Sequence, residues 1–441
     1  MRRSDPDGPA VIVDPYSSGA LFAPAFADAG VPVVAVVSSP EPPDVYAASY
    51  RPEHFTTILT ATEDLGPLVE KLRALRPRCV LPGCESGVEL ADALAPQVVE
   101  DVANVPEKAS ARRHKGDMAA AVAQAGLPVI RQLCTDDVEE VEAWLRRSNL
   151  TGRDLVIKPP KSASTDGVTR VPRGDGWRQV FQAMLGRPNR LAIINDRLVV
   201  QEYVTGTEYV VDTFSYEGIH TVTDVCQYHK VDNGPYMAVY ESMEWLSPAT
   251  PGLDDAISYA RCVLDAVGMR FGAAHVELML TREGPRLIEI GARPHGGGHP
   301  RFCRVATGDS QVDRTVRYFA RLGPIPGGFD LRTHVLVGFL ISRTAGIVRN
   351  AEIFGEVEAL ASHHFSVVRF RNGDALEPTK DLFGSLDLGF VVLAHADRSQ
   401  VRADYHKIRS MERRLRLDVV PPASGPFPRG SAAREAGGAQ S

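Results

Sequence analysis

Two glutamates, Glu277 and Glu289, lie in a stretch whose pattern is typical of a β-hairpin. Apolar, strand-like residues stand on both sides of a turn-forming segment, TREGP at 281–285. A three-residue loop that pairs Thr281 with Pro285 places the two glutamates directly opposite each other on one face. Like charges in that position repel, but a bound cation makes them a ligand pair, and magnesium prefers carboxylate oxygens. The alternative is two solvent-exposed glutamates on an edge hairpin, because the register is assumed from the turn.

The composition is that of an ordinary globular protein, and its length of 441 residues corresponds to about three domains. The net charge is −6 with acidic and basic residues mixed, so no basic surface indicates nucleic acid or an anionic membrane as a partner. No apolar stretch is long enough for a membrane span, and the first ten residues do not resemble a signal peptide.

The cysteines and lysines give two further indications. The six cysteines are scattered without CxxC pairs, so we expect reduced thiols in a cytoplasmic protein. Of the 49 basic residues only 8 are lysines, which is typical of a GC-rich genome and favours specialised metabolism such as antibiotic biosynthesis. This scarcity also makes each lysine a stronger candidate for function.

Strand and helix patterns alternate in the first hundred residues and predict a small parallel α/β unit. Its strands are expected at 10–14, 31–37 and 78–81, with helices at 20–29 and 88–94. A helix at 111–125 opens the next region, and four long strand-like runs fall between 197 and 246. From about residue 331 strands and turns return, with one late helix at 402–415. The tail at 421–441 is rich in Pro, Gly, Ala and Ser and is expected to be disordered.

Lys158 ends a β-branched strand and precedes Pro159 and Pro160 and the polar loop KSASTDG. An ammonium group followed by hydroxyls and free amides suits a diphosphate. The loop is not a Walker A motif, and the alternative is a plain hairpin or crossover.

The segment 200–209 (VQEYVTGTEY) predicts a strand, a Gly-containing bend and a second strand. Such a hinge offers backbone groups to the edge of an adenine, and Glu208 offers a carboxylate to ribose hydroxyls. The alternative is a hairpin that carries an exposed charge.

Several motifs in series resemble the ATP-grasp superfamily. They are Lys115 in RRHKGDM, Lys158 with SASTDGVT, QEYVTGTEYVVD, HVELML and LIEIGARPHGGG. LPGCESGVELADAL, GTEYVVDTFS and IEIGARPHGG are similar in particular to carboxylate–amine ligases related to bacterial L-amino acid ligases (dipeptide synthetases). The resemblance runs from about residue 10 to 415.

The resemblance implies an α/β and α+β protein with the ATP-grasp fold. Its parts would be an N-terminal parallel α/β (pre-ATP-grasp) domain at 1–108, a central ATP-clamping small domain at 109–205, and a C-terminal α+β region at 206–420 with the metal site and a β-rich subdomain. The implied reaction joins a carboxylate to an amine through an acyl phosphate, with release of ADP and phosphate.

Site roles also follow from the resemblance. Glu277 and Glu289 would bind Mg²⁺, with Mn²⁺ as a substitute. Arg293, which the hairpin period places on the face of Glu289, would stabilise the phosphorylated intermediate and the oxyanion, with Lys158 as the second catalytic residue. The residues implied to bind ATP are Lys115, Lys158, Ser164, Thr165, Gly167, Gln201, Glu202, Val204 and Glu208.

Two departures from the family pattern stand out. Many ATP-grasp enzymes have Asn two residues after the second glutamate, where this chain has Gly291, so one metal ligand is missing or replaced by water. The phosphate loop has Ser162, Ala163 and Ser164 in place of the usual glycines.

Three other residues are candidates for substrate or metal binding. His295 and His299 lie four apart in PHGGGHP, which is not helical, so a substrate-lining role for His295 is favoured over zinc. Glu241 is a candidate for holding the amino group of an amino-acid substrate. The segment DPYSSG at 14–19 offers amides to an anion, but a scaffold role is favoured there.

The predicted partners are small-molecule carboxylates and amines, with no nucleic acid and no membrane, and the resemblance also allows a homodimer. One alternative is another ATP-grasp activity, such as a carboxylase or a purine-pathway ligase. The other is a catalytically inactive nucleotide-binding protein, against which the retained glutamates and Arg293 speak.

Overall fold

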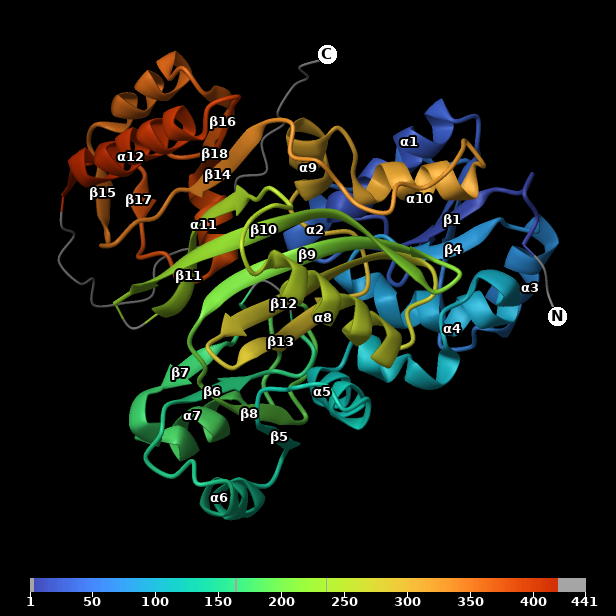
Figure 1. Cartoon of the computed structure of the whole chain (residues 1–441), viewed down its shortest axis with the longest axis horizontal. Helices are drawn as coiled ribbons and strands as arrows, with labels where there is room; N and C mark the ends of the chain where they lie inside the picture. Colours follow the sequence, from blue (N-terminus) through green and yellow to red (C-terminus); the bar gives the residue numbers. More distant parts are fainter. Residues whose placement is uncertain (1–3, 163–164, 235, 419–441) are drawn as a thin grey trace.

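The computed structural model describes residues 4–162, 165–234 and 236–418. Figure 1 shows a large sheet across the middle of the molecule, a small sheet beneath it in green, the N-terminal unit in blue, and the C-terminal strands and helices in orange and red. The predicted disordered tail at 421–441 and Ser164 lie outside the described residues. The predicted domain boundaries stay predictions.

The N-terminal unit is a four-stranded parallel sheet in the order β3-β2-β1-β4. Its strands are β1 (Ala10–Val13), β2 (Val33–Val37), β3 (Thr57–Thr60) and β4 (Cys79–Pro82), and its helices are α1 (Phe22–Asp28), α2 (Asp44–Ala47), α3 (Gly66–Leu75) and α4 (Val88–Val98). The β-branched runs in β1 and β2 are fully buried because apolar clusters form on both faces of the sheet. Among these strands only β3 was not predicted, since this edge strand is mostly exposed, and helices α2 and α3 were not predicted either.

The central part opens with α5 (Lys115–Gln124) and contains a four-stranded antiparallel sheet in the order β5-β8-β6-β7. Its strands are β5 (Gln132–Thr135), β6 (Leu155–Lys158), β7 (Thr169–Val171) and β8 (Leu198–Glu202), and its helices are α6 (Val138–Arg147) and α7 (Trp177–Met184). Pro159 and Pro160 follow β6 directly and have no amide to continue a ladder, so Lys158 ends the strand as predicted.

The large sheet has eight strands, ordered β13-β12-β9-β10-β11-β14-β18-β16, and every neighbouring pair is antiparallel. The strands are β9 (Thr207–Tyr216), β10 (Ile219–Asn233), β11 (Tyr236–Trp245), β12 (Gly272–Thr281), β13 (Gly284–Gly291), β14 (His334–Phe339), β16 (His363–Val368) and β18 (Gly389–His395). Helix α8 (Leu253–Ala266) packs against β9, β12 and β13 and closes the largest apolar cluster (Figure 1).

Four more helices accompany this sheet. A separate three-stranded sheet has the strand order β17-β15-β19. The helices are α9 (His299–Thr307), α10 (Gln311–Phe319), α11 (Leu382–Leu388) and α12 (Arg398–Arg414), and the strands are β15 (Gly346–Val348), β17 (Ala375–Leu376) and β19 (Leu417–Asp418). Helix α10 packs beside α1 of the N-terminal unit, so segments far apart in the sequence meet there (Figure 1). Among the described helices, none has both the length and the apolar character that crossing a membrane requires.

Candidate active site

The hairpin of β12 and β13 places Glu277 directly opposite Glu289, as predicted, but by a different route. The predicted pairing of Thr281 with Pro285 is wrong: Thr281 pairs with Gly284, so the turn is one residue tighter. A β-bulge between Glu277 and Leu278 then adds one residue to β13 and restores the register at the glutamates. The turn is one residue shorter than predicted and the bulge adds one residue, so the two differences cancel at the glutamates.

The two carboxylates experience different electrostatics although they share one face. Burial and the negative charge of Glu289 raise the pKa of Glu277. Burial also opposes the ionisation of Glu289, but Lys115 and Lys158 outweigh it and lower its pKa to about 2. Two facing carboxylate groups fit a divalent cation such as Mg²⁺, because the cation would remove the repulsion that raises the pKa of Glu277.

Two lysines from different elements approach this pair. Lys115, at the start of α5, donates to Glu289 over 2.8 Å, and its ammonium lies 3.3 Å from the carbonyl oxygen of Ser162. Lys158, at the end of β6, is 4% exposed, and burial together with the charge of Lys115 lowers its pKa to about 8. An anion with several charges would satisfy both ammonium groups.

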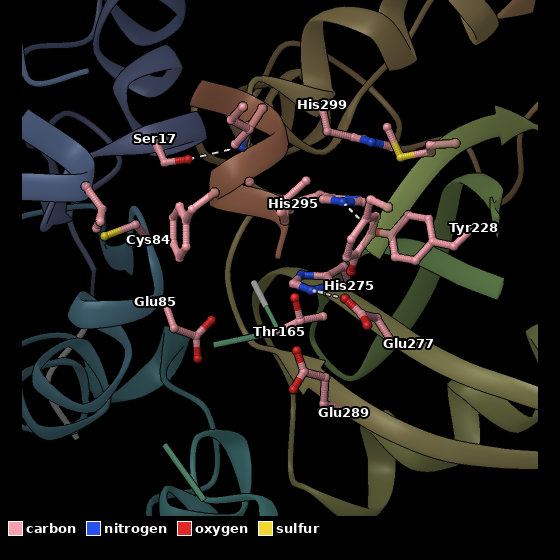
Figure 2. Close-up of a pocket in the computed structure, with 18 of the residues that line it drawn as sticks. Ser17, Cys84, Glu85, Thr165, Tyr228, His275, Glu277, Glu289, His295 and His299 are labelled. Atoms are coloured by element: carbon pink, nitrogen blue, oxygen red, sulfur yellow. Dashed lines mark hydrogen bonds and ion pairs between the residues drawn. The ribbon is translucent and has the colours of Figure 1, made fainter. Parts of the chain in front are cut away.

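Arg293 follows β13 and connects the hairpin to the N-terminal unit. Its Nε donates to Glu85 over 2.9 Å, and Arg113 lies 3.2 Å from the same carboxylate. Its Nη1 lies 3.0 Å from Nδ1 of His275. Figure 2 shows Glu85 on the opposite side of the pocket from Glu277 and Glu289. The acidic group between two guanidinium groups fixes Arg293 beside the facing glutamates.

Lys158, the two glutamates and Arg293 line one cavity of about 1000 Å³. The cavity lies between the N-terminal unit, the four-stranded antiparallel sheet and the eight-stranded sheet. Gln201 and Glu202 at the end of β8 line it, as do Tyr203 and Val204 beyond the strand. Apolar side chains beside them complete a slot of the kind that a flat heterocycle needs. These are Ile130, Val156, Met279 and Ile288.

Residues 151–300 match the family model described as the ATP-grasp domain. The chain is 28% identical over 414 residues to dapdiamide A synthase of Enterobacter agglomerans, which covers 91% of this chain and 95% of that protein. The resemblance to the ATP-grasp superfamily is therefore confirmed, and residues 151–300 carry the ATP-grasp domain.

The ATP-grasp fold is confirmed over nearly the whole chain. The structure of L-amino acid ligase from Bacillus licheniformis matches with a TM-score of 0.69 at 16% identity, over 96% of this chain and all of that one. Carboxyaminoimidazole ribonucleotide synthase from Aspergillus clavatus, complexed with ATP, matches with a TM-score of 0.67 at 13% identity, over 93% of this chain and all of that one. The expectation that the chain is an ATP-grasp ligase is also confirmed.

Most of the residues that the ATP-grasp resemblance singled out meet at this cavity. The lining includes Lys158, Thr165, Gln201, Glu202, Val204, Glu208, Glu277, Glu289 and Arg293, and also His295, the separate candidate for lining the substrate. Lys115 reaches the site through its contact with Glu289. Gly167 is not among the lining residues; it has φ +72°, and a Cβ there would lie 2.9 Å from Pro159, so the loop needs a glycine at this turn. The roles of all these residues stay predictions.

Two of the predicted adenine-side residues already have protein partners. Gln201 donates to Gln132 over 2.7 Å, and Gln132 donates to the carbonyl oxygen of Lys115. Glu202 accepts from Arg131 through the Nε and Nη2 atoms of its guanidinium. Gln132 thereby connects Gln201 with the helix that carries Lys115.

Glu241 is not brought to the cavity. The ladder between β10 and β11 shifts between His229 and Lys230, and this bulge leaves Glu241 unpaired while Tyr240 and Met243 line the cavity. The charge of Glu241 instead helps to raise the pKa of Glu412, on α12, to about 7, where burial is the main cause. The structure therefore places Glu241 away from any substrate in the cavity.

The cavity lining also includes residues that were not predicted, and Glu85, Lys230 and His275 are the ones that contact predicted site residues. Lys230 donates to Glu208 over 2.6 Å and lies over the ring of Tyr240. Its signal in the sequence was the scarcity of lysines. Glu85 stands in the motif LPGCESGVELADAL, and His275 precedes Glu277 by two residues, so both were near features already singled out.

A buried cluster of two aspartates and two histidines lies beside the cavity, and we call Asp212, Asp224, His295 and His299 the aspartate–histidine cluster. His299 lies 2.8 Å from both aspartates, and although burial opposes its charge, they raise its pKa to about 9. His295 contacts Asp212 and the Tyr228 hydroxyl, each over 2.8 Å, while burial and His299 lower its pKa to about 4. Both nitrogens of His295 are therefore occupied, which weakens the predicted substrate role.

The histidine rings in this cluster do not favour the zinc alternative. The rings of His295 and His299 are stacked, with centroids 3.8 Å apart and planes 11° apart. A zinc ion lies close to the plane of each imidazole that binds it, so two parallel stacked rings direct their lone pairs past a common ion. The aspartates already balance the charge of His299.

Proposed function

We propose that this protein is an ADP-forming carboxylate–amine ligase that joins a small carboxylic acid or amino acid to an amine. The observation that carries the proposal is the facing pair Glu277 and Glu289, surrounded by Lys115, Lys158 and Arg293 at one cavity. The similarity to dapdiamide A synthase over 91% of the chain supports the amide-forming reaction and a place in specialised metabolism.

In the first step the substrate carboxylate attacks the γ-phosphorus of ATP, the bond to ADP breaks, and an acyl phosphate forms. Lys115 and Lys158 would bind the phosphate groups. The pKa of Lys158 is about 8, so its ammonium keeps its charge at any pH below that value. Glu277 and Glu289 would hold Mg²⁺, which would neutralise phosphate charge. The cavity between the sheets would exclude water from the acyl phosphate.

In the second step the amine attacks the carbonyl carbon, the C–O bond to phosphate breaks, and inorganic phosphate leaves. Arg293 is held beside the glutamates by Glu85, so its remaining donors would stabilise the oxyanion of the tetrahedral intermediate. At the other end of the cavity, Gln201, Glu202 and Val204 would bind the adenine side, while Glu208, held by Lys230, would accept from the ribose hydroxyls.

The test is release of phosphate and ADP from Mg–ATP in the presence of paired amino acids and small acids, with hydroxylamine added separately to trap an acyl phosphate as a hydroxamate. We expect turnover that needs two particular partners and that is lost in Glu289→Gln. Glu283→Gln, an exposed glutamate in the turn of the same hairpin, is the matched control and keeps full turnover. Bicarbonate-dependent turnover, or ATP binding without turnover on any pair, would contradict the proposal.

A cytoplasmic location is part of this proposal. All six cysteines are free thiols in the structure, which is typical of a reducing compartment. The homodimer stays a prediction.

A further inference from the structure

His275 on β12 and Gly291 on β13 are paired directly across the hairpin. A Cβ atom added at Gly291 would lie 2.3 Å from Cε1 and 2.7 Å from Nδ1 of His275. No side chain at position 291 fits while the imidazole is in place, because both distances are far below van der Waals contact. The imidazole thus occupies the space in which the Asn of many ATP-grasp enzymes would stand.

The hydrogen bonds of His275 define which of its nitrogens carries the proton. Nη1 of Arg293 lies 3.0 Å from Nδ1, and a guanidinium can only donate, so Nδ1 accepts. The ring proton is therefore on Nε2, which lies 3.5 Å from Oε1 of Glu277 (Figure 2). His275 is 2% exposed, so water does not compete for these contacts.

These contacts continue into the N-terminal unit. Arg293 donates through Nε to Glu85, so an unbroken series of polar contacts runs from Glu85 through Arg293 and His275 to Glu277. Its two ends lie on opposite sides of the cavity (Figure 2). A displacement of the imidazole would change the position of both Arg293 and Glu277.

We propose that His275 is a positioning residue that holds the metal-binding carboxylate of Glu277 and the guanidinium of Arg293 in fixed relation, and that Gly291 is required because it leaves room for the imidazole. The inference rests on the proposed metal role of Glu277 and Glu289. These three side chains lie close enough to share an ion, but the contact of Nδ1 with Arg293 and the approach of Nε2 to Glu277 assign His275 to orienting the carboxylate.

The experiment measures Mn²⁺ binding to the full chain with saturating ADP, by the electron paramagnetic resonance signal of free Mn²⁺. We expect His275→Ala to weaken Mn²⁺ binding by about 10–100-fold, as loss of a group that orients a metal ligand does. His275→Gln, whose amide can both accept and donate, should recover most of the affinity. His364→Ala, an exposed histidine of β16, is the matched control and leaves binding unchanged.

The role of Gly291 is tested by a double-mutant cycle with the same readout. Gly291→Ala should weaken Mn²⁺ binding in the natural background, because its methyl group displaces the imidazole. In the His275→Ala background the same change should alter binding by less than about twofold, since the two residues then no longer compete for space. Additive effects of the two changes would overturn the proposal.

Two further outcomes separate this inference from the proposed function. If Glu289→Gln loses Mn²⁺ binding while His275→Ala keeps it, the inference fails and the metal site stands. If Glu289→Gln binds Mn²⁺ as the natural protein does, the metal site itself is refuted. Pulsed spectra that show a directly coordinated histidine nitrogen on Mn²⁺ would overturn the positioning role, and thermal unfolding of each variant confirms that it is folded.

Discussion

The carboxylate pair of the hairpin and the aspartate–histidine cluster are two acidic regions at the same cavity. A cationic histidine lies between the aspartates, whereas the two glutamates face each other directly. In the cluster, His299 lies 2.8 Å from both Asp212 and Asp224, so one imidazolium is shared by the two carboxylates. In the hairpin, Glu277 faces another carboxylate, and its pKa is raised by burial and by Glu289. Removing the partner of a buried charge destabilises a structure, whereas two buried like charges repel each other until a cation lies between them.

The largest effect is expected from removing the charge at the centre of the cluster. His299→Gln leaves Asp212 and Asp224 buried without their cation, which should lower the free energy of unfolding by about 3–5 kcal/mol. Chemical denaturation at pH 6 measures this, with His364→Gln as the control. A loss below about 1 kcal/mol would mean that the cluster is not held by charge.

Glu277→Gln should lower activity without lowering stability. We expect turnover to fall by about 100-fold or more, because a proposed metal ligand is lost, while the stability of the protein without ligands stays equal or rises slightly. The neutral amide removes the repulsion with Glu289. Thermal unfolding and phosphate release on the same preparation measure both quantities. Destabilisation as large as that of His299→Gln would erase the contrast between the two regions.

The two regions should also differ in the sign of their pH dependence. The pKa of Lys158 is about 8 in the folded protein and higher when unfolded, so the unfolded chain binds more protons between about pH 8 and pH 10.5. Lys158→Met is expected to be more stable than the natural protein below pH 8, with the difference narrowing as the pH rises toward 10.5. ADP binding by the natural protein should weaken over the same rise, since Lys158 loses its charge.

The contribution of His299 to the free energy of unfolding should change with pH in the opposite direction. Its folded pKa is about 9 against 6.5 for an ordinary histidine, so its stabilising contribution is complete below pH 6.5 and is lost as the pH rises through 9. The difference in unfolding free energy between the natural protein and His299→Gln should therefore shrink over that range. Denaturation series at half-unit pH steps measure both slopes, and slopes of equal sign would contradict the assignment.

The smallest effect is expected from Tyr228→Phe, at the border of the two regions. The change removes the hydroxyl that His295 contacts and should lower the unfolding free energy by about 1 kcal/mol. Mn²⁺ binding should stay within about twofold of the natural protein, because the Tyr228 hydroxyl hydrogen-bonds His295 and not a glutamate of the hairpin. A large loss of Mn²⁺ binding would show that the two regions are coupled.

Local patterns in the sequence were sufficient for the strands that carry the site. The β-branched run before Pro159 predicted that Lys158 ends a strand, and the apolar runs around TREGP predicted the hairpin. Bulges were not predictable, because one extra residue leaves no mark on composition. A bulge restored the register of Glu277 and Glu289, whereas another displaced Glu241 from the cavity.

The sequence by itself predicted the ATP-grasp fold, the order of its parts and the residue types of the predicted phosphate site. The resemblance rests on motifs that are local in the chain, such as Lys158 at a strand end and the glutamate hairpin. Only the tertiary structure decided which distant groups complete the site. Glu85 reaches Arg293 across 208 residues of sequence, and the side chain of His275 fills the space that Gly291 leaves open. Such contacts depend on how the N-terminal unit and the large sheet pack together, and spacing within one segment carries no information about that packing.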